Sequence, residues 1–469
     1  MAKDFRRETP RTKNKPLSPL LSPWQIPVAG FLGLIFLGAF LLCAFPTPGG
    51  GHLSFIDALF MSTSATCVTG LSLIDIGTQL SGWGQLVLLA EIQLGGLGIM
   101  IISTVLLMML GRGLSLRSRM LVQDTYTYGP TAQLHRVIKA VVLSTLVFET
   151  LGALLLFIRF SSQMNFQAAA VSSLFHAISA FCNAGFGLFA DSFISYQADP
   201  LVNLTITGLI ICGGIGFLVL YELANLRFHP GSLRHSWQHL SLHSKLVLTV
   251  TAVLLAGGTL FFLGSEWNCT LQGLNPPTKV LAAWFQSVTT RTAGFNTLDF
   301  SAMNNISLLG TIMLMFIGAS PGSTGGGIKT STVGVLLALS RARISGTLYP
   351  HAFKRTIDQE TIDRAFSVLA LSMAIVMVAT ALLLWSELGS VPQAQSRGRF
   401  LELLFEVVSA FGTVGLSMGA TPRLTDWGKL ILVVVMFIGR LGPLVLAMAI
   451  QAREKRGRFQ YAHERVMIG

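Results

Sequence analysis

The sequence predicts an all-α integral membrane protein in which four similar units surround a single pore. Two observations support this fold class. The chain of 469 residues is 52% hydrophobic and only 12% charged, whereas a soluble protein carries about 25% charged residues. Four short segments also align with one another without a gap, and each contains a glycine at the same position: Phe60–Ser72, Phe175–Gly187, Trp284–Asn296 and Phe405–Ser417.

Apolar runs long enough to cross a bilayer recur along the chain. A membrane-spanning helix needs about 20 predominantly apolar residues. Runs near this length occupy Ile26–Phe45, Leu86–Leu110, Val137–Ile158, Leu201–Leu220, Leu246–Leu263, Ala365–Trp385 and Leu430–Ile450. No small-residue cleavage site follows the first run, so we expect it to be a span and not a signal peptide.

Each aligned glycine follows a half-length helical stretch, such as Ser54–Ala65, that is too short to cross a bilayer. We therefore expect four M1-P-M2 repeats, each with a span, a re-entrant pore helix and a second span. This gives eight spans and four pore helices around a pseudo-fourfold pore. The expected division of the chain is an N-terminal arm (1–23), repeat 1 (24–112), repeat 2 (135–227), repeat 3 (243–343), repeat 4 (362–453) and a C-terminal tail (454–469).

The basic residues are expected on one side of the membrane. A formal net charge of +12 would also suit a nucleic-acid-binding protein, but the Lys and Arg residues gather at the chain ends and between the repeats. They occupy the N-terminal arm and the segments Arg112–Lys139, Arg227–Lys245, Arg341–Arg364 and Arg453–Arg465. If the spans alternate in direction, all these segments face one side. The positive-inside rule then places both termini in the cytoplasm, and no nucleic-acid partner is expected.

The four aligned glycines indicate a filter for a monovalent cation. Irregular backbone at membrane depth is tolerated where it is buried in protein or lines a cavity, and rings of backbone carbonyls select cations. Glycine suits such a segment because it readily adopts a positive φ. If the pore helices point their C-terminal ends at the axis, their dipoles place negative potential there. The glycines concerned are Gly70, Gly185, Gly294 and Gly415.

A polar stretch interrupts one apolar run and predicts a gate. Gly318–Lys329 is rich in glycine and hydroxyl residues, so we expect a loop at 318–329 that blocks the pore below the filter or moves aside. Arg440 lies within the last span, where a charge is costly and indicates function; it is expected to act as an electrostatic barrier. Arg291 lies within the third filter segment, and its side chain is expected behind the filter, bonded to backbone or a carboxylate.

The remaining ionisable residues and cysteines indicate packing roles. Lys329 is expected to anchor the gate loop to a carboxylate, and Glu91 and Glu149 to pair with a basic group or a helix end. Five cysteines have neither metal-ligand nor CxxC spacing, which argues against a disulfide framework. The glycines before Lys329 lack the GxxxxGK[ST] spacing of a phosphate-binding loop. No enzyme activity and no cofactor are expected in this chain.

Taken in order, the four segments resemble those of the Ktr/Trk/HKT superfamily of potassium transporters. The likeness covers nearly the whole chain and includes Ser323–Lys329 in repeat 3 and Gly439–Pro443 in repeat 4. Within the superfamily it is greatest for KtrB, the membrane subunit of bacterial Ktr systems. The reason is that the first span begins near Trp24, which leaves no room for the two additional N-terminal helices of Trk proteins.

The resemblance implies a role for individual residues. Potassium would bind the filter carbonyls of Thr66, Cys67, Val68, Thr69 and Gly70; Phe181, Cys182, Asn183, Ala184 and Gly185; Thr290, Arg291, Thr292, Ala293 and Gly294; and Phe411, Gly412, Thr413, Val414 and Gly415. The gate would comprise Ser323, Thr324, Gly325, Gly326, Gly327, Lys329 and Arg440. In the superfamily, glycine at the position of Gly70 goes with potassium selectivity, and serine there goes with sodium preference in some plant members.

The resemblance also implies a function and partners. It implies potassium uptake across the bacterial cytoplasmic membrane, driven by the membrane potential, with sodium as a further candidate substrate or coupling ion. It implies a homodimer with one pore per subunit and a separate cytoplasmic ring of KtrA type that binds ATP or ADP. Two alternatives stay open at this point. One is a sodium-selective member of the same fold, and the other is a secondary carrier for an organic solute, with broken helices at a midmembrane site.

Overall fold

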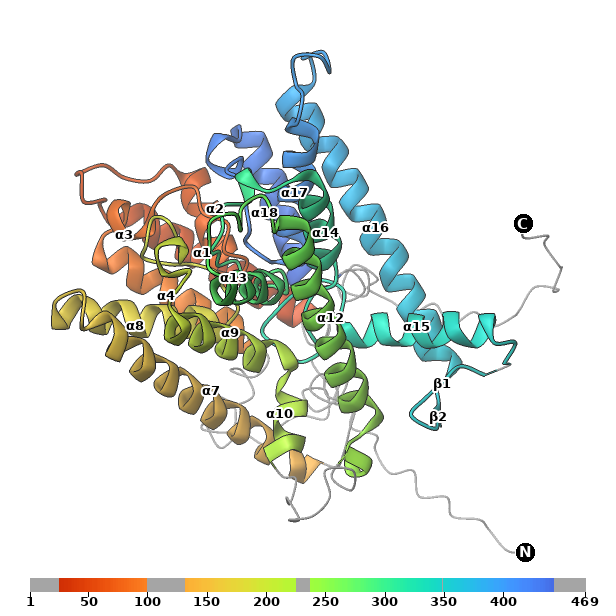
Figure 1. Ribbon diagram of the computed structural model, residues 1–469. Helices are drawn as coiled ribbons and strands as arrows, with labels where there is room; N and C mark the ends of the chain where they lie inside the picture. Colours follow the sequence, from red (N-terminus) through yellow and green to blue (C-terminus); the bar gives the residue numbers. More distant parts are fainter. Residues whose placement is uncertain (1–24, 99–130, 225–236, 348, 443–469) are drawn as a thin grey trace, which may run out of the picture.

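The computed structural model describes residues 25–98, 131–224, 237–347 and 349–442 (Figure 1). This part of the chain is mostly helical, and its two short strands, β1 (His351–Ala352) and β2 (Arg355–Thr356), form an antiparallel hairpin. The predicted N-terminal arm and C-terminal tail lie outside the described residues. So do parts of the basic segments, at 112–130 and 227–236.

Helices follow one another in an order that recurs four times (Figure 1). Each time, a first helix is followed by a shorter second helix and then by a third. The four sets are α1 (Gln25–Ala44), α2 (Phe55–Thr66) and α4 (Gly82–Leu97); α7 (Thr131–Phe160), α8 (Phe166–Phe181) and α9 (Pro200–Ile215); α12 (Leu242–Glu266), α13 (Pro276–Thr289) and α14 (Asn305–Phe316); and α16 (Gln359–Leu388), α17 (Arg399–Gly412) and α18 (Asp426–Leu441). Additional elements are α3 (Ile76–Gln79), η1 (Ile194–Tyr196), α10 (Phe217–Ala224), η2 (Phe300–Ala302), α15 (Thr330–Ile344) and η3 (Thr421–Arg423).

The third helix of every set begins at a residue that caps it. A side-chain oxygen at the N-cap accepts a hydrogen bond from a backbone N–H of the first turn, which would otherwise lack a partner. These bonds join Ser81 to Gly84 N at 3.4 Å, Asp199 to Val202 N at 3.2 Å, Asn304 to Ser307 N at 2.8 Å and Thr425 to Gly428 N at 3.2 Å.

The second helices form the interior of the molecule. Every residue from Phe60 to Thr66 in α2 and from Phe405 to Gly412 in α17 is buried. The C-terminal halves of α8 and α13 are buried to a similar extent. Their phenylalanines, such as Phe181 and Phe285, belong to the largest fully buried side chains. The core is therefore built around the C-terminal ends of these four helices.

The four sets are arranged in a closed ring. The third helix of each set packs on the second helix of the next, so that α4 contacts α8, α9 contacts α13 and α14 contacts α17. The last contact, between α18 and α2, joins the end of the chain to its beginning. Four repeated contacts in one order are what a pseudo-fourfold arrangement requires.

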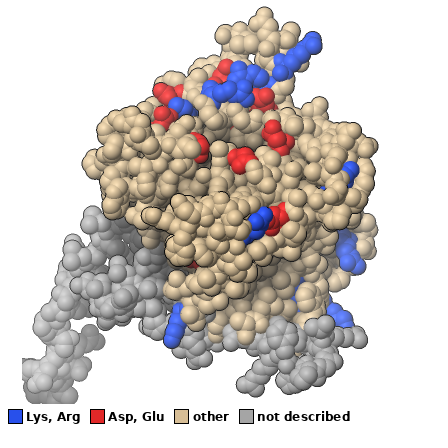
Figure 2. All heavy atoms as spheres, turned by 60° about the vertical axis from the view of Figure 1, so that its left-hand side comes forward, with Lys and Arg blue, Asp and Glu red and all other residues tan. Residues whose placement is uncertain are grey.

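The outer helices present apolar side chains to the surroundings. Three described helices are long and apolar enough to cross a membrane: Val141–Phe160, Leu242–Glu266 and Gln359–Leu388. Four further apolar helices are shorter: Val28–Ala44, Phe166–Phe181, Pro200–Ile215 and Asn305–Phe316. Large side chains such as Phe40 and Leu260 are exposed on the outer helices. In the space-filling view the sides of the molecule carry little charge (Figure 2), as expected for a surface in contact with lipid.

The third helices end earlier than the apolar runs predict. Leu201–Leu220 was expected as one continuous span, and this expectation is wrong because Gly216, with φ of 98°, separates α9 from α10. Gly98 follows α4 with φ of 77° and ψ of 133°, and Gly442 follows α18 with φ of 84° and ψ of 137°. This region of backbone conformation is essentially restricted to glycine. Hydropathy cannot detect such a break, because glycine interrupts the helix without adding polarity.

Candidate ion pathway

The four predicted filter segments share one backbone conformation. The glycines have positive φ, and so has the residue two positions earlier. These earlier residues have φ of 55° at Val68, 60° at Asn183, 66° at Thr292 and 49° at Thr413. A positive φ is unfavourable for branched residues such as Val and Thr. Strain that recurs at one position in four segments indicates a functional requirement.

Each segment directly follows the C-terminal end of a buried helix, where partial negative charge accumulates. The four residues before the glycine are buried in every segment, and the glycine alone is partly exposed. The structure therefore brings all twenty predicted filter residues to the ends of α2, α8, α13 and α17.

The four glycines contact one another around the ring. A Cβ atom added to any of them would collide with the carbonyl oxygen that precedes the glycine of the next segment. The distances would be 2.3 Å from Gly70 to Ala184 O, 2.7 Å from Gly185 to Ala293 O, 2.7 Å from Gly294 to Val414 O and 2.2 Å from Gly415 to Thr69 O. The segments thus follow one another in chain order and close on the first, which leaves no space for a side chain at these positions.

Buried hydroxyl groups support the filter backbone from behind. The Ser64 hydroxyl oxygen accepts a hydrogen bond from Gly70 N at 3.1 Å, and that of Ser409 accepts one from Gly415 N at 3.1 Å. The Ser179 hydroxyl donates to Phe186 O at 2.7 Å. These bonds hold the turn at the glycine, because each gives a backbone group of the irregular segment a partner that it would otherwise lack.

The third segment differs from the other three. In those three, the residue before the glycine donates its N–H to a carbonyl five residues earlier, as Thr69 does to Ser64 O at 2.7 Å. In the third segment Ala293 N donates instead to Thr289 O, four residues earlier, at 3.0 Å. The four segments therefore correspond at the glycine, but the backbone hydrogen bond at the end of the preceding helix differs in the third segment.

A second set of glycines supports the inner ends of the filter segments, and the sequence reasoning missed it. A Cβ atom on Gly95 would lie 2.0 Å from Thr66 O, one on Gly213 would lie 1.9 Å from Phe181 O and one on Gly439 would lie 2.0 Å from Phe411 O. The signal in the sequence is a repeated tetrapeptide, G-x-[LI]-G, at 95–98, 213–216 and 439–442. Its first glycine contacts the filter and its last glycine ends the helix.

The predicted gate loop lies against the inner ends of three filter segments. α14 ends at Phe316 and α15 begins at Thr330, so residues 318–329 connect two helices. The Thr324 hydroxyl donates to Phe181 O at 3.3 Å, and Gly326 N donates to the Thr413 hydroxyl at 3.0 Å. A Cβ atom on Gly325 would lie 2.1 Å from the Thr292 hydroxyl oxygen. The loop therefore packs against residues that precede the glycine in three of the four predicted filter segments.

Arg440 connects this loop to the first set of helices. Its guanidinium donates to Thr324 O in the loop and to Gly95 O in α4. In the repeated tetrapeptide, Arg440 takes the position that Gly96 and Gly214 occupy in the other copies. One copy of the tetrapeptide thus carries a cation where the two other copies carry no side chain.

Two further basic residues have partners other than those expected. Lys329 was expected to bond a carboxylate, but its Nζ donates to Gly325 O at 2.7 Å. Arg291 was expected to bond backbone or a carboxylate, but its Nη2 donates to the Thr251 hydroxyl of α12 at 3.3 Å. Both expectations about the partner are wrong. Carbonyl and hydroxyl oxygens accept from a buried cation without bringing a second charge, whose desolvation would be costly.

Glu91 and Glu149 were expected to pair with a basic group or a helix end, and neither forms an ion pair with a basic group among the described residues. Glu149 accepts a hydrogen bond from Gln93 Nε2 at 3.2 Å and contacts the Cys182 thiol at 3.9 Å. Glu91 accepts from Ser62 and Thr66 of α2 through one oxygen. Both carboxyl groups are buried, with 3% and 5% of Glu91 and Glu149 exposed.

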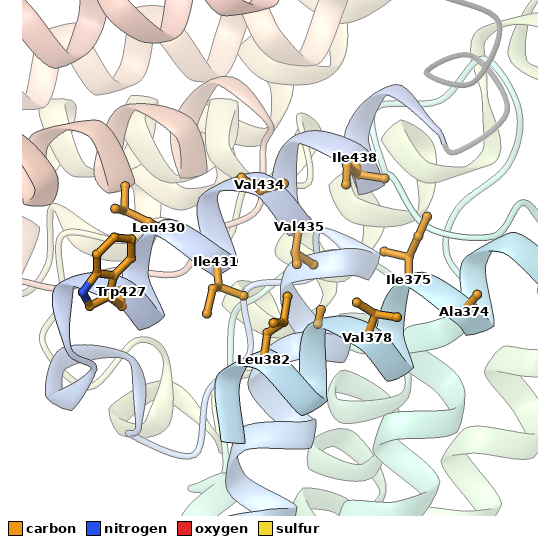
Figure 3. A pocket seen from close by; sticks show the side chains of 11 residues that line it. Ala374, Ile375, Val378, Leu382, Trp427, Leu430, Ile431, Val434, Val435 and Ile438 are labelled. Carbon is orange, nitrogen blue, oxygen red and sulfur yellow. The ribbon is translucent and has the colours of Figure 1, made fainter. Parts of the chain in front are cut away.

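Charged side chains gather around a hollow at one end of the molecule, shown at the top of Figure 2. Among the described residues no group of three His, Cys, Asp or Glu residues could hold a metal ion. A separate groove of about 510 Å³ lies between α16 and α18, with Val378 and Val434 on its two walls and Trp427 at one end (Figure 3). Its lining is apolar throughout and offers no oxygen ligands to a cation, so it is not part of the ion pathway.

Comparison with known proteins agrees with this geometry. The family model of the TrkH cation transport proteins matches residues 28–456. The chain belongs to this family. It is 41% identical to the Ktr system potassium uptake protein B of Bacillus subtilis, over 96% of this chain and 97% of that protein. It is 39% identical to the protein of the same name from Vibrio alginolyticus, over 95% of this chain and 94% of that protein.

Two further relatives extend the comparison. The potassium/sodium uptake protein NtpJ of Enterococcus hirae is 35% identical over 96% of this chain and 98% of its own length. The crystal structure of the potassium transporter TrkH from Vibrio parahaemolyticus matches with a TM-score of 0.70 and 20% identity, covering 93% of this chain and 86% of that one. The likeness to TrkH shows that the fold is shared. The resemblance to the Ktr/Trk superfamily that the sequence predicted is confirmed.

Proposed function

We propose that this TrkH family member is the membrane subunit of a Ktr-type potassium uptake system. The observation that supports it most is the ring of four glycine segments, closed by contacts from Gly70 to Ala184 and onward to Gly415 and Thr69. Such a ring presents backbone carbonyls to a central ion, which replace its hydration shell. The printed names of two relatives at 41% and 39% identity give potassium as the ion.

In this proposal the molecule has eight spans and four re-entrant pore helices. The buried second helices, α2, α8, α13 and α17, enter from outside and stop at the filter. The basic segments between the repeats face the cytoplasm together with both termini, as the positive-inside rule requires. The protein would thus lie in the bacterial cytoplasmic membrane, with the charged hollow in Figure 2 as the outer mouth of the pore.

The loop at 318–329 and Arg440 are proposed as the gate. Thr324 and Gly326 contact the inner ends of the second and fourth segments, and Arg440 connects the loop to α4. A cation leaving the filter would meet the guanidinium at short range. In a site shielded from water this repulsion is larger than at a surface. Opening then requires the loop and Arg440 to move together.

Partners follow from the kind of system. A protein named as a component of a Ktr system implies further components, and we propose a cytoplasmic nucleotide-binding ring of KtrA type together with a homodimer of this chain. Light scattering of the purified protein would directly measure whether the chain forms a homodimer. A monomer at micromolar concentration in detergent and in lipid nanodiscs would contradict the homodimer.

Ion flux tests the main proposal. Liposomes containing the purified protein should take up Rb⁺, used as a potassium analogue, and external K⁺ should inhibit this uptake at lower concentrations than Na⁺. Equal inhibition by both ions would favour the sodium-transporting alternative, which the name of NtpJ supports. Folded protein that carries neither Rb⁺ nor Na⁺ above the level of protein-free liposomes would overturn the proposal.

A further inference from the structure

The carboxyl group of Glu91 lies directly behind the first filter segment. It is held between α1, α2 and α4, and 3% of the residue is exposed. Its Oε1 accepts hydrogen bonds from the Ser62 hydroxyl at 2.5 Å and from the Thr66 hydroxyl at 3.3 Å. A Cβ atom on Gly38 would lie 1.7 Å from this oxygen, so α1 leaves room for the carboxyl group by having a glycine there.

Glu91 is joined to the innermost filter residue in two ways. Its side chain bonds the Thr66 hydroxyl, and Gly95, one turn later in α4, packs against Thr66 O. The carboxyl group is therefore adjacent to a residue whose carbonyl is a proposed ion ligand. Any negative charge on Glu91 acts on that site through buried protein, where screening by water and salt is weak.

The carboxyl group of Glu91 has no cationic partner among the residues that the structure describes. Glu91 Oε2 has no hydrogen-bond partner, and no described Lys or Arg forms an ion pair with Glu91. A buried carboxylate is stable when it is paired with a cation or binds a metal ion, and without either the protonated, neutral form is favoured. A hydrogen bond donated to Oε1, such as that from the Thr66 hydroxyl, favours the negative form. A cation in the inner part of the filter would supply the missing positive charge.

We propose that Glu91 is ionised when a cation occupies the inner filter, and that its negative charge raises the affinity of this site for the permeant cation. This inference rests on the proposed function. Glu149 is different because its two oxygens contact Gln93 and Cys182. Glu406, in the last pore helix, is bonded by Ser417 and Thr421. Among these three buried carboxyl groups, Glu91 alone combines an unpartnered oxygen with a bond to a filter residue.

Glu91→Gln removes the charge and keeps the shape. The amide oxygen can still accept from Ser62 and Thr66, so a purely structural clamp would survive. We expect the half-saturating Rb⁺ concentration for uptake into liposomes to rise about tenfold. Blocking by Ba²⁺ should weaken by the square of that factor, about a hundredfold, because Coulomb energy is proportional to the ionic charge. Glu91→Asp keeps the charge. The ratio of the half-blocking Ba²⁺ concentration to the half-saturating Rb⁺ concentration should therefore stay at its wild-type value.

Glu266→Gln is the matched control. Glu266 is also fully buried, and its oxygens accept from Asn304 N at 3.1 Å and Thr270 N at 3.2 Å, outside the filter segments. This variant should leave both ion constants unchanged. If Glu91→Gln does not reach the membrane, Glu91→Met gives the same comparison, since Ser62 can then donate its single hydroxyl proton to Ile35 O, 2.7 Å away.

The outcomes separate this inference from the proposed function. Wild-type protein that carries no Rb⁺ contradicts the function itself. The inference alone is overturned by a second outcome. In it the wild-type protein carries Rb⁺, and a neutral Glu91 variant has the same Rb⁺ and Ba²⁺ constants as the wild type. Equal weakening for the two ions would also overturn it, because a distorted site and not a lost charge would then be the cause.

Discussion

Lys429 Nζ lies 2.7 Å from Asp57 Oδ1, although 372 residues separate the two in the chain. Lys429 belongs to the first turn of α18 and Asp57 to the first turn of α2. Their ion pair therefore joins the fourth set of helices to the first. These two sets are far apart in the sequence, so no short connecting loop links them as it links successive sets. A second carboxylate, Asp426, lies 3.1 Å from the same nitrogen.

Lys429→Ala should weaken this closure. The pair is partly buried, with 14% of the Lys429 side chain and 28% of the Asp57 side chain exposed. We expect a loss of about 1 kcal/mol, at the upper end of the range for accessible ion pairs. Thermal unfolding in detergent, followed by size-exclusion chromatography, measures this loss. Lys279→Ala is the control, because Lys279 contacts Trp267 within a single set. An equal shift in both variants would show that the pair does not close the ring.

Gly70→Ser should reduce selectivity for potassium. Gly70 has φ of 95°, and its added Cβ atom would lie 2.3 Å from Ala184 O. The carbonyl ring must therefore widen or tilt, and the ratio of Rb⁺ to Na⁺ uptake should fall severalfold or more. Gly257→Ala is the control, since nothing lies within 4 Å of that position. A Gly70→Ser protein with the wild-type ratio would refute the assignment of the filter.

Gly213→Ala should reduce uptake and stability together. The new methyl group would lie 1.9 Å from Phe181 O, so α9 must move away from the second filter segment. Overpacking of this kind costs about 1–3 kcal/mol. Gly208→Ala in the same helix meets nothing within 4 Å and should leave uptake unchanged and raise helix propensity. Identical behaviour of the two variants would mean that the tetrapeptide glycines do not support the filter.

Arg440→Ala should raise Rb⁺ uptake, most clearly at low external concentration. The variant removes a partly buried cation from the proposed path and releases Thr324 O and Gly95 O. Uptake and thermal stability have to be measured on the same preparation. Lower uptake with a lower melting temperature would show that Arg440 holds the structure together, in which case its role in the gate is withdrawn. Lys429→Ala provides the comparison, because it affects a second contact between the fourth set and the first.

The sequence predicted the superfamily and the helical membrane fold because both depend on local, repeated patterns. Four glycines in one register, such as Gly70 and Gly415, can be read without knowledge of packing. The partners of buried charges could not be predicted in this way. Lys329 bonds Gly325 O and Arg291 bonds Thr251, and these choices depend on which oxygen the folded chain brings within reach. The break at Gly216 was missed because hydropathy averages over the glycine that causes it.

The position of Arg440 has a consequence for how such a pore evolves. In a channel assembled from four identical chains, any substitution is copied onto every wall, so an arginine below the filter would place four positive charges around one ion. Here a single polypeptide provides all four walls, and Gly96 and Gly214 occupy the positions that correspond to Arg440. Each wall of a single chain can therefore have its own chemistry. In the proposed gate, one moderate obstacle on one side regulates a path that four such obstacles would close permanently.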